Sequence, residues 1–299
     1  MSHPSLAFVG FGEAGQALAA GFRAEGVASL AAWDILFPDA KAGAPLRAVA
    51  ERLGVRIGRD ALDAVRGADV VFSAVTAASN LEAAERAAPG LSRAQFYVDL
   101  NSVSPDRKRQ AAKIVGERAR FVGMAVMAPV HPLRHKTPVL VSGPAARELA
   151  ALLRRCGMEV TEVGADIGAA AAVKMVRSVM VKGLAALTQE CFLAARRAGV
   201  EERIIASLTQ SYPMIDWAKF ADYNLERMAT HGLRRAAEMR DVCETLESLG
   251  VEPALTRGTA IREQRTGEAR LKEKFDGKVP EERGAILDAL IRQDREPLV

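Results

Sequence analysis

The sequence predicts an α/β protein in which a doubly wound parallel sheet is followed by an all-helical domain. Two observations lead to this fold class. Short apolar segments alternate with helical patterns over the first part of the chain, and from about Gly168 onwards almost every stretch has a helical pattern. The composition agrees, because 49% of the 299 residues are hydrophobic and only 5% are aromatic, which suits a helix-rich globular protein.

Each predicted strand is a short apolar segment with turn or polar residues at its ends. The first covers residues 6–9 and stops at a glycine, and the second covers residues 30–35 and includes Asp34. Further strands are predicted over residues 55–57, 69–75, 96–100, 121–126, 139–141 and 160–163, with helical segments between them. Strands that alternate with helices in this way form a parallel sheet with helices on both faces.

A long alanine-rich helix is predicted over residues 169–197 and is interrupted only mildly at Gly183. A helix of this length usually links or spans two domains. The sequence therefore predicts a sheet domain over residues 1–166 and an all-helical domain over residues 167–299, joined by this interdomain helix.

A glycine-rich turn follows the first strand and opens a helix. It comprises Gly10, Phe11, Gly12, Glu13, Ala14 and Gly15. Gly10 permits a sharp turn, Gly12 lets a pyrophosphate approach the backbone, and Gly15 lets the helix pack closely on the sheet. The N–H groups at the helix N-terminus then face the phosphates. The pattern predicts a Rossmann-type dinucleotide site, and the alternative is a turn that only packs a helix on a sheet.

Asp34, at the end of the second strand, is placed where a carboxylate would bind the adenosine ribose. Its charge would repel a 2′-phosphate, which favours NAD as the cofactor. Lys41 and Arg47 lie nearby in sequence and keep NADP open, and a turn or helix-cap carboxylate is the alternative role for Asp34. Val75 and Thr76 follow the fourth strand and are expected to face the cofactor, because such sheets bind ligands at the carboxyl ends of their strands.

Charge and cysteine content argue against several other functional classes. The net charge of +4 comes from 41 basic and 37 acidic residues that are interleaved, so no nucleic-acid partner is expected. The longest apolar runs are shorter than a membrane span, and no signal peptide is seen. Cys156, Cys191 and Cys243 are far apart in the sequence, which predicts no metal site and suits a reducing cytoplasm.

Four blocks of sequence occur in an order typical of one enzyme superfamily. The glycine turn comes first, and the second block is VDLNSVSP over residues 98–105. The third is APV over residues 128–130, and the fourth is the glycine-rich segment 164–168, which leads into Lys174. With these blocks the chain resembles the β-hydroxyacid dehydrogenase and 6-phosphogluconate dehydrogenase superfamily, which includes the 3-hydroxyisobutyrate dehydrogenases.

The resemblance implies roles for two residues and an assembly. Ser102 would lie near the nicotinamide end of the cofactor, and Lys174 would be the catalytic lysine. A homodimer is also implied, because the long helices of these proteins often interlock between subunits.

The substrate part of the chain departs from the family pattern. The family has Ser-Gly-Gly after the APV block, whereas this chain has the basic segment HPLRHKT over residues 131–137. His131 takes the first position of the missing motif and is expected to bind an anionic substrate, an exposed basic loop being the alternative. The family's asparagine four residues after the lysine is Ser178 here, and Arg177 stands one position earlier.

Lys174 lies in an otherwise apolar helical stretch, which is unusual for a solvated lysine. Oxidation of an alcohol needs a base for the hydroxyl proton, and a lysine can serve where burial or a neighbouring cation lowers its pKa. Arg177 and Ser178 follow one turn later on the same side, where they would bind the substrate anion and the reacting oxygen. The alternatives are a lysine that snorkels to solvent and an arginine in an interhelix salt bridge.

The sequence thus predicts an NAD(P)-dependent oxidoreductase that acts on the CH–OH group of a small anionic hydroxy acid, with Lys174 as general acid and base. NAD is the expected cofactor, and NADP is the alternative. Two other functions stay open: imine reduction, against which the retained lysine argues, and a non-catalytic NAD(P)-binding sensor or scaffold. His231, followed by Arg234 and Arg235, belongs either to the same site or to a surface helix.

Overall fold

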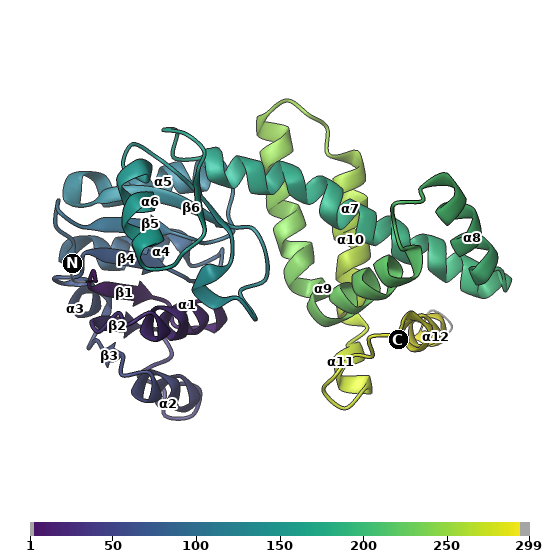
Figure 1. The fold of residues 1–299 in the computed structure, drawn as a ribbon, viewed down its shortest axis with the longest axis horizontal. Coiled ribbons are helices and arrows are strands. Elements are labelled where there is room, and N and C mark those ends of the chain that lie inside the picture. Colours follow the sequence, from purple (N-terminus) through teal and green to yellow (C-terminus); the bar gives the residue numbers. More distant parts are fainter. Residues whose placement is uncertain (1–2, 294–299) are drawn as a thin grey trace. The chain divides into compact units, whose positions relative to one another are not determined.

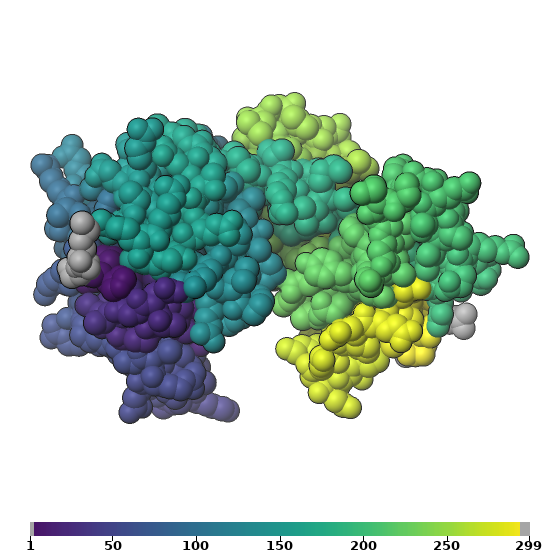
Figure 2. Space-filling model, viewed as in Figure 1, coloured from purple at the N-terminus to yellow at the C-terminus, as the bar shows by residue number. Residues whose placement is uncertain are grey.

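The computed structural model describes residues 3–293 of the chain. The chain divides into two compact units, an N-terminal unit (Met1–Lys174) and a C-terminal unit (Met175–Val299). The division falls inside the long helix, whereas the predicted boundary preceded that helix. Figure 2 shows the chain as a space-filling view, coloured by residue number from purple at the N-terminus to yellow at the C-terminus.

The N-terminal unit is built on one eight-stranded sheet (Figure 1). Its strands are β1 (Leu6–Val9), β2 (Leu30–Trp33), β3 (Arg56–Ile57), β4 (Val70–Ser73), β5 (Phe96–Asp99), β6 (Arg120–Val126), β7 (Val139–Ser142) and β8 (Val160–Glu162). Their order across the sheet is β3-β2-β1-β4-β5-β6-β7-β8. The chain winds in opposite directions from β1, so the crevice between β1 and β4 is the place where such sheets bind ligands.

The predicted doubly wound α/β fold is confirmed, with one refinement in strand direction. The strands from β1 to β6 run parallel to one another, but β7 pairs antiparallel with β6, and β8 is parallel to β7. The sheet is therefore mostly rather than wholly parallel. The connection from β6 to β7, residues 127–138, contains no α-helix, and a parallel crossover would need one or a comparably long connection.

Helices cover both faces of the sheet, as the two apolar clusters of this unit show. The helices are α1 (Glu13–Ala24), α2 (Ala44–Arg52), α3 (Ala61–Val65), α4 (Asn80–Ala87), α5 (Pro105–Val115) and α6 (Ala146–Arg155). One cluster joins Leu6 and Phe8 of β1 to residues of α1 and α6, and the other joins Ala7 and Val9 to residues of α3, α4 and α5. Successive residues of a strand point to opposite faces, so β1 is buried on both sides, which explains its continuous apolar run.

The rest of the chain is helical, as predicted. The helices are α7 (Ala169–Ala198), α8 (Glu201–Ser211), α9 (Trp217–Ser248), α10 (Ala254–Glu268), α11 (Leu271–Lys274) and α12 (Arg283–Gln293). Within the C-terminal unit, α9 and α10 pack so closely that a Cβ at Gly232 would lie 2.7 Å from the Gly267 nitrogen. Across residues 3–293, no helix combines the length and the apolar character needed to cross a membrane.

Candidate active site

The glycine turn connects β1 to α1 at the crevice of the sheet. Gly10 has a φ of 93°, a conformation that favours glycine, and a Cβ there would lie 2.4 Å from the Ala74 carbonyl oxygen. A Cβ at Gly15 would lie 2.6 Å from the Gly10 carbonyl oxygen. Both glycines are therefore needed by the packing of the protein itself. Phe11, between them, is fully buried in the core.

Gly12 differs from its two neighbours because the protein alone does not require a glycine there. Its φ is −75°, which any residue adopts, and a Cβ at this position would meet no atom of the described residues within 4 Å. Gly12 is the N-cap residue of α1, and no side chain in the described part of the chain caps this helix. The space beside Gly12 and the N–H groups of the first turn, which includes Glu13 and Ala14, fit a phosphate group.

Asp34 supports the glycine turn from the end of β2. Its side chain is 9% exposed, and its two oxygens accept hydrogen bonds from Phe11 N (2.7 Å) and Leu36 N (2.9 Å). Asp34 thus acts as a carboxylate that stabilises a turn, which is the alternative role predicted for it. It is compatible with ribose binding, because each carboxylate oxygen has a second lone pair. Arg47 donates to the carbonyls of Phe37, Asp39 and Ala40, so its guanidinium organises the loop after β2.

The segments that follow β4 and β5 are tied together by Asn101. Its Oδ1 accepts from Val75 N at 2.7 Å, and its Nδ2 donates to Ser73 Oγ at 3.0 Å and to Asp99 Oδ1 at 2.8 Å. Thr76 is exposed and donates to Ser79 Oγ. The sequence pattern predicts Val75 and Thr76 as cofactor-binding residues. It does not identify Asn101 and Asp99, whose hydrogen bonds hold the segments after β4 and β5 in place.

Lys174 and Ser102 are brought together in the N-terminal unit. Lys174 Nζ donates a hydrogen bond of 2.7 Å to Ser102 Oγ, and both side chains are half-buried. The two residues lie 72 positions apart in sequence. Arg177 and Ser178 follow Lys174 by three and four residues on α7, one turn along the same side of the helix. Arg177 is exposed and Ser178 is half-buried.

The position of Lys174 is set by the segment that leads into α7. Asp166 accepts two hydrogen bonds from Arg109 of α5, at 2.8 and 3.2 Å, and this guanidinium lowers the pKa of the Asp166 carboxyl. Ser142 Oγ donates to Ile167 O and accepts from Ala170 N. The start of α7 is thereby fastened to α5 and β7, and Lys174 follows after about one helical turn.

The basic segment 131–137 does not gather its four basic side chains in one place. His135 is 3% exposed and packs against Phe22 of α1, with 5.4 Å between the ring centroids. Lys136 forms an ion pair of 2.8 Å with Glu25, the C-cap residue of α1. His131 and Arg134 are exposed. The expected basic cluster is therefore split: His135 and Lys136 contact α1 and its C-cap, and His131 and Arg134 stay accessible in the loop after β6.

Charged residues of the C-terminal unit form pairs within that unit. Lys182 Nζ lies 2.6 Å from Glu238, which also pairs with Arg234, and Arg235 pairs with the buried Glu263 at 2.6 Å. Burial raises the pKa of Glu263, and Arg235 opposes this shift. Arg234 and Arg235 are thus engaged by acids of their own unit.

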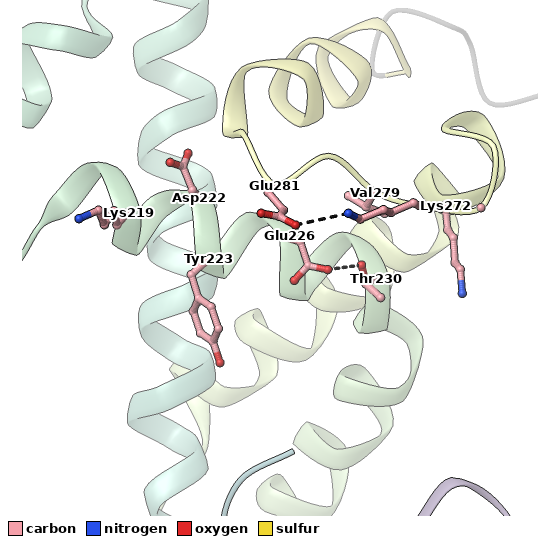
Figure 3. A pocket seen from close by; sticks show the side chains of 10 residues that line it. Lys219, Asp222, Tyr223, Glu226, Thr230, Lys272, Val279 and Glu281 are labelled. Atoms are coloured by element: carbon pink, nitrogen blue, oxygen red, sulfur yellow. Dashed lines mark hydrogen bonds and ion pairs between the residues drawn. The ribbon is translucent and has the colours of Figure 1, made fainter. Parts of the chain in front are cut away.

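A cavity of about 690 Å³ lies beside α9 and the segment that follows α11 (Figure 3). Its lining includes Asp222, Tyr223, Glu226, Lys278 and Glu281. The dashed lines in Figure 3 mark two contacts within this lining, from Lys278 to Glu281 and from Thr230 to Glu226. Within residues 3–293, the residues that line this cavity include none of those predicted for the active site.

Two family models match parts of the chain. The model described as NADP oxidoreductase, coenzyme F420-dependent, matches residues 5–102, which contain the glycine turn, Asp34 and Ser102. A domain of unknown function, DUF1932, matches residues 195–266 in the C-terminal unit. The cofactor half of the chain is therefore that of an NAD(P)-binding protein.

Relatives resemble this chain over most of its length. An uncharacterised 28.5 kDa protein of Methanothermus fervidus is 30% identical over 214 residues, which are 71% of this chain and 81% of the relative. The structure of a conserved hypothetical protein from Sinorhizobium meliloti 1021 is 40% identical, with a TM-score of 0.78 over 98% of this chain and 97% of that one.

Two further structures connect the chain to hydroxyacid dehydrogenases. The conserved protein MTH1747, which is structurally similar to 3-hydroxyacid dehydrogenases, is 30% identical, with a TM-score of 0.72 over 90% of this chain and 98% of that one. The 3-hydroxyisobutyrate dehydrogenase of Mycobacterium tuberculosis has the same fold at 16% identity, with a TM-score of 0.72 over 98% and 100% of the two chains. The chain therefore belongs to the family of 3-hydroxyacid dehydrogenase-like proteins and is an NAD(P)-binding oxidoreductase.

Proposed function

We propose that the protein transfers a hydride between the CH–OH carbon of a small anionic hydroxy acid and NAD(P), with Lys174 as the general acid and base. The observation that carries the proposal is the hydrogen bond of 2.7 Å from Lys174 Nζ to Ser102 Oγ. It brings the amine of α7 to a hydroxyl just beyond the carboxyl end of β5. Sheets of this type bind dinucleotides at that edge.

The proton step needs only residues of this chain. The bound cofactor supplies the hydride acceptor or donor. In the direction of oxidation, the neutral Lys174 amine takes the hydroxyl proton as the hydride leaves the carbon, and in reduction the ammonium returns a proton to the oxygen. Ser102 orients the amine, because its hydroxyl accepts a hydrogen bond from Nζ.

Cations near Lys174 would bind the acidic group of the substrate. Arg177 follows one turn later on α7, and a guanidinium binds a carboxylate through two parallel hydrogen bonds. Ser178, four residues after Lys174 on the same helix, would hydrogen-bond the reacting oxygen. His131 comes from the loop after β6, which runs parallel to β5 and so ends at the same edge of the sheet. These three residues are our candidates for substrate binding.

The cofactor would bind with its pyrophosphate at Gly12 and its adenosine ribose at Asp34. The open space beside Gly12 supports the first contact, and the acceptor capacity left on Asp34 supports the second. The negative charge of Asp34 favours NAD over NADP, because it would repel a 2′-phosphate.

A second copy of this chain is the partner that we propose for α7. Val173, Val176, Met180, Leu184 and Leu187 recur at helical spacing on α7, and each is between 38% and 64% exposed. A stripe of this kind on a soluble protein usually marks an interface. The twofold contact of a homodimer would cover it.

The replacement Lys174→Ala tests the proposed role of the lysine, with Lys113→Ala on the exposed surface of α5 as the matched control. Wild type and variants are assayed with NAD⁺ and NADP⁺ on a panel of small hydroxy acids. We expect Lys174→Ala to lower kcat by about 100-fold or more, while the Kd for NADH stays unchanged. Unchanged turnover would remove Lys174 from the mechanism.

A second assay, with a panel of imines and with NADH and NADPH as the hydride donors, separates the competing functions. Turnover of imines but of no hydroxy acid would assign imine reduction to the site. Tight NADH binding without turnover of either class would favour the non-catalytic sensor.

A further inference from the structure

A lysine is fully buried beneath the edge of the sheet that carries Ser102. Lys108 lies on α5 and is 1% exposed. Its Nζ has three oxygen atoms within hydrogen-bonding distance: Asp99 O at 2.6 Å, Asp99 Oδ1 at 2.9 Å and Met124 O at 3.4 Å. An ammonium group has three N–H donors, so each has an acceptor at the carboxyl end of β5 or in β6.

The partner carboxylate is equally constrained. Asp99 is 0% exposed, and its Oδ1 accepts from Lys108, from Asn101 N at 3.0 Å and from Asn101 Nδ2 at 2.8 Å. Its Oδ2 accepts from Asn80 Nδ2 at 2.8 Å, at the start of α4. Asp99 therefore links α4, α5 and the segment after β5.

Asn101 extends this linkage to both candidate cofactor segments. It clamps Val75 N through its Oδ1, and it precedes Ser102, whose hydroxyl receives the Lys174 amine. Three hydrogen-bonded contacts and one step along the chain thus connect the buried Lys108 to Lys174: Lys108 to Asp99, Asp99 to Asn101, Asn101 to the adjacent Ser102, and Ser102 to Lys174.

Stability alone does not account for a buried ion pair. Removing both charges from water costs about as much as their attraction returns, so apolar pairs of similar volume are often as stable or more stable. Burial lowers the pKa of Lys108, and the charge of Asp99 opposes this shift. A fully hydrogen-bonded ion pair does fix the orientation of its side chains. All three donors of Lys108 are engaged, so the Asp99 carboxylate has one orientation, and in it Asp99 accepts hydrogen bonds from Asn101.

We propose that Lys108, Asp99 and Asn101 form a positioning network that holds the Ser102 hydroxyl where it accepts the Lys174 amine. The three residues act through Ser102 and do not themselves touch the substrate. The proposal rests on the proposed function, since it assigns a role within the same site.

The test measures how readily Lys174 is acylated in the full-length protein. Acetic anhydride is used at a limiting concentration, and the acetylation of each lysine is quantified by peptide mass spectrometry. Lys113, exposed on the same helix as Lys108, is the internal reference. Lys108→Met, Asn101→Ala and Ser102→Ala are compared with wild type, together with the double variant Lys108→Met/Ser102→Ala.

We expect each single variant to raise the acylation of Lys174 relative to Lys113 by about fivefold, the factor that corresponds to one ordinary hydrogen bond. The double variant should show no further rise beyond Ser102→Ala, because Lys108 acts through Ser102. A merely structural role for Lys108 would change thermal stability and leave the relative labelling of Lys174 as in wild type.

Wild-type labelling of Lys174 in a folded Lys108→Met or Asn101→Ala protein would overturn the proposal, and so would independent effects in the double variant. Lys108→Met leaves Asp99 as a buried charge without its cation and can fail to fold for that reason. In that case the Asn101→Ala variant tests the proposal, because it keeps the ion pair between Lys108 and Asp99. The assay needs no substrate. Unchanged labelling would therefore not affect the proposed role of Lys174 in hydride transfer. Conversely, a turnover assay that removed Lys174 from the mechanism would not change the labelling result.

Discussion

The three glycines of the turn are present for two different physical reasons. Gly10 and Gly15 are required by close backbone contacts within the protein, whereas the space beside Gly12 is open. A sequence pattern treats the three positions alike. Their surroundings separate the two that serve the fold from the one that fits a ligand.

The replacement Gly12→Ser should therefore leave the fold intact and block cofactor binding. Serine is a good N-cap residue, so we expect the free energy of unfolding to change by less than about 0.5 kcal/mol, while the new side chain occupies the phosphate space. Gly15→Ser is the matched control, and its Cβ would contact the Gly10 carbonyl and cost about 1–3 kcal/mol of stability. Denaturant unfolding and NADH titration measure the two effects, and normal NADH affinity in Gly12→Ser would contradict the assignment.

Asp34 is expected to determine the choice between the two nicotinamide cofactors. In Asp34→Asn the side-chain oxygen can still accept from Phe11 N, but the charge is removed. We expect the ratio of NADPH to NADH affinity to rise by about tenfold, because the repulsion of a 2′-phosphate is lost. Asp39→Asn, in the exposed loop that follows, is the control. A wild type that already prefers NADPH would refute the role given to Asp34.

Some residues of the site could have been found from the sequence, and others could not. Lys108 falls on the apolar side of its helix with Ala111 and Val115, at a spacing of three and seven residues, and this pattern signals a buried lysine. The contact between Lys174 and Ser102 joins positions 72 residues apart. Spacing along the chain does not encode such a contact. The family resemblance gave each residue a role in the active site but did not predict that the two are hydrogen-bonded.

At the scale of elements, the segment 131–137 is an anchored loop. His135 is seated on α1 where Gly21 has no side chain, since a Cβ there would lie 2.1 Å from His135 Nδ1. Sequence alone could not show this packing, because Gly21 and His135 are remote in the chain. The anchor leaves His131 at an exposed position of the same loop.

Acid should loosen this anchor. Burial lowers the pKa of His135. The charge of Glu25, at the C-cap of α1, opposes this shift, and the nearby Lys136 and Arg134 reinforce it. The detached loop therefore binds a proton more readily than the packed loop. The packing is strongest above a pH of about 6.5, the pKa of a free imidazole, and weakens as the pH falls from there through the lower pKa of packed His135. We expect faster amide hydrogen exchange of residues 131–137 at about pH 5.5 than at about pH 7.5, after correction for intrinsic rates.

His135→Phe is the control for this pH effect. Phenylalanine keeps an aromatic ring beside Phe22 but cannot take up a proton, so the corrected exchange rates should no longer depend on pH. An equal pH dependence in wild type and His135→Phe would show that another group is responsible.

The direction of β7 shows what an apolar pattern leaves undetermined. Residues 139–141 were correctly predicted as a strand, but a short buried strand has the same apolar run in either direction. The informative signal was the connection over residues 127–138, which is short and has no helical pattern. Connection length therefore determines strand direction here better than strand composition.

For the whole molecule, the apolar stripe on α7 predicts a dimer. Met180 and Leu187 are 63% and 64% exposed, and glutamate at both positions should place two charges in the interface. We expect Met180→Glu/Leu187→Glu to shift the protein from dimer to monomer in analytical ultracentrifugation. Leu255→Glu on α10, at a position 84% exposed, is the control and should leave the dimer unchanged. A monomeric wild type would refute the proposal.

Proton transfer by Lys174, with NAD(P) taking or giving the hydride, is tested most directly by a crystal structure of the protein with NAD⁺ and a hydroxy acid that it turns over. We expect the substrate hydroxyl within hydrogen-bonding distance of Lys174 Nζ, with the nicotinamide on the reacting carbon and the acidic group on Arg177 or His131. A substrate whose hydroxyl contacts another titratable side chain, with Lys174 remote from it, would show that Lys174 is not the proton-transferring residue.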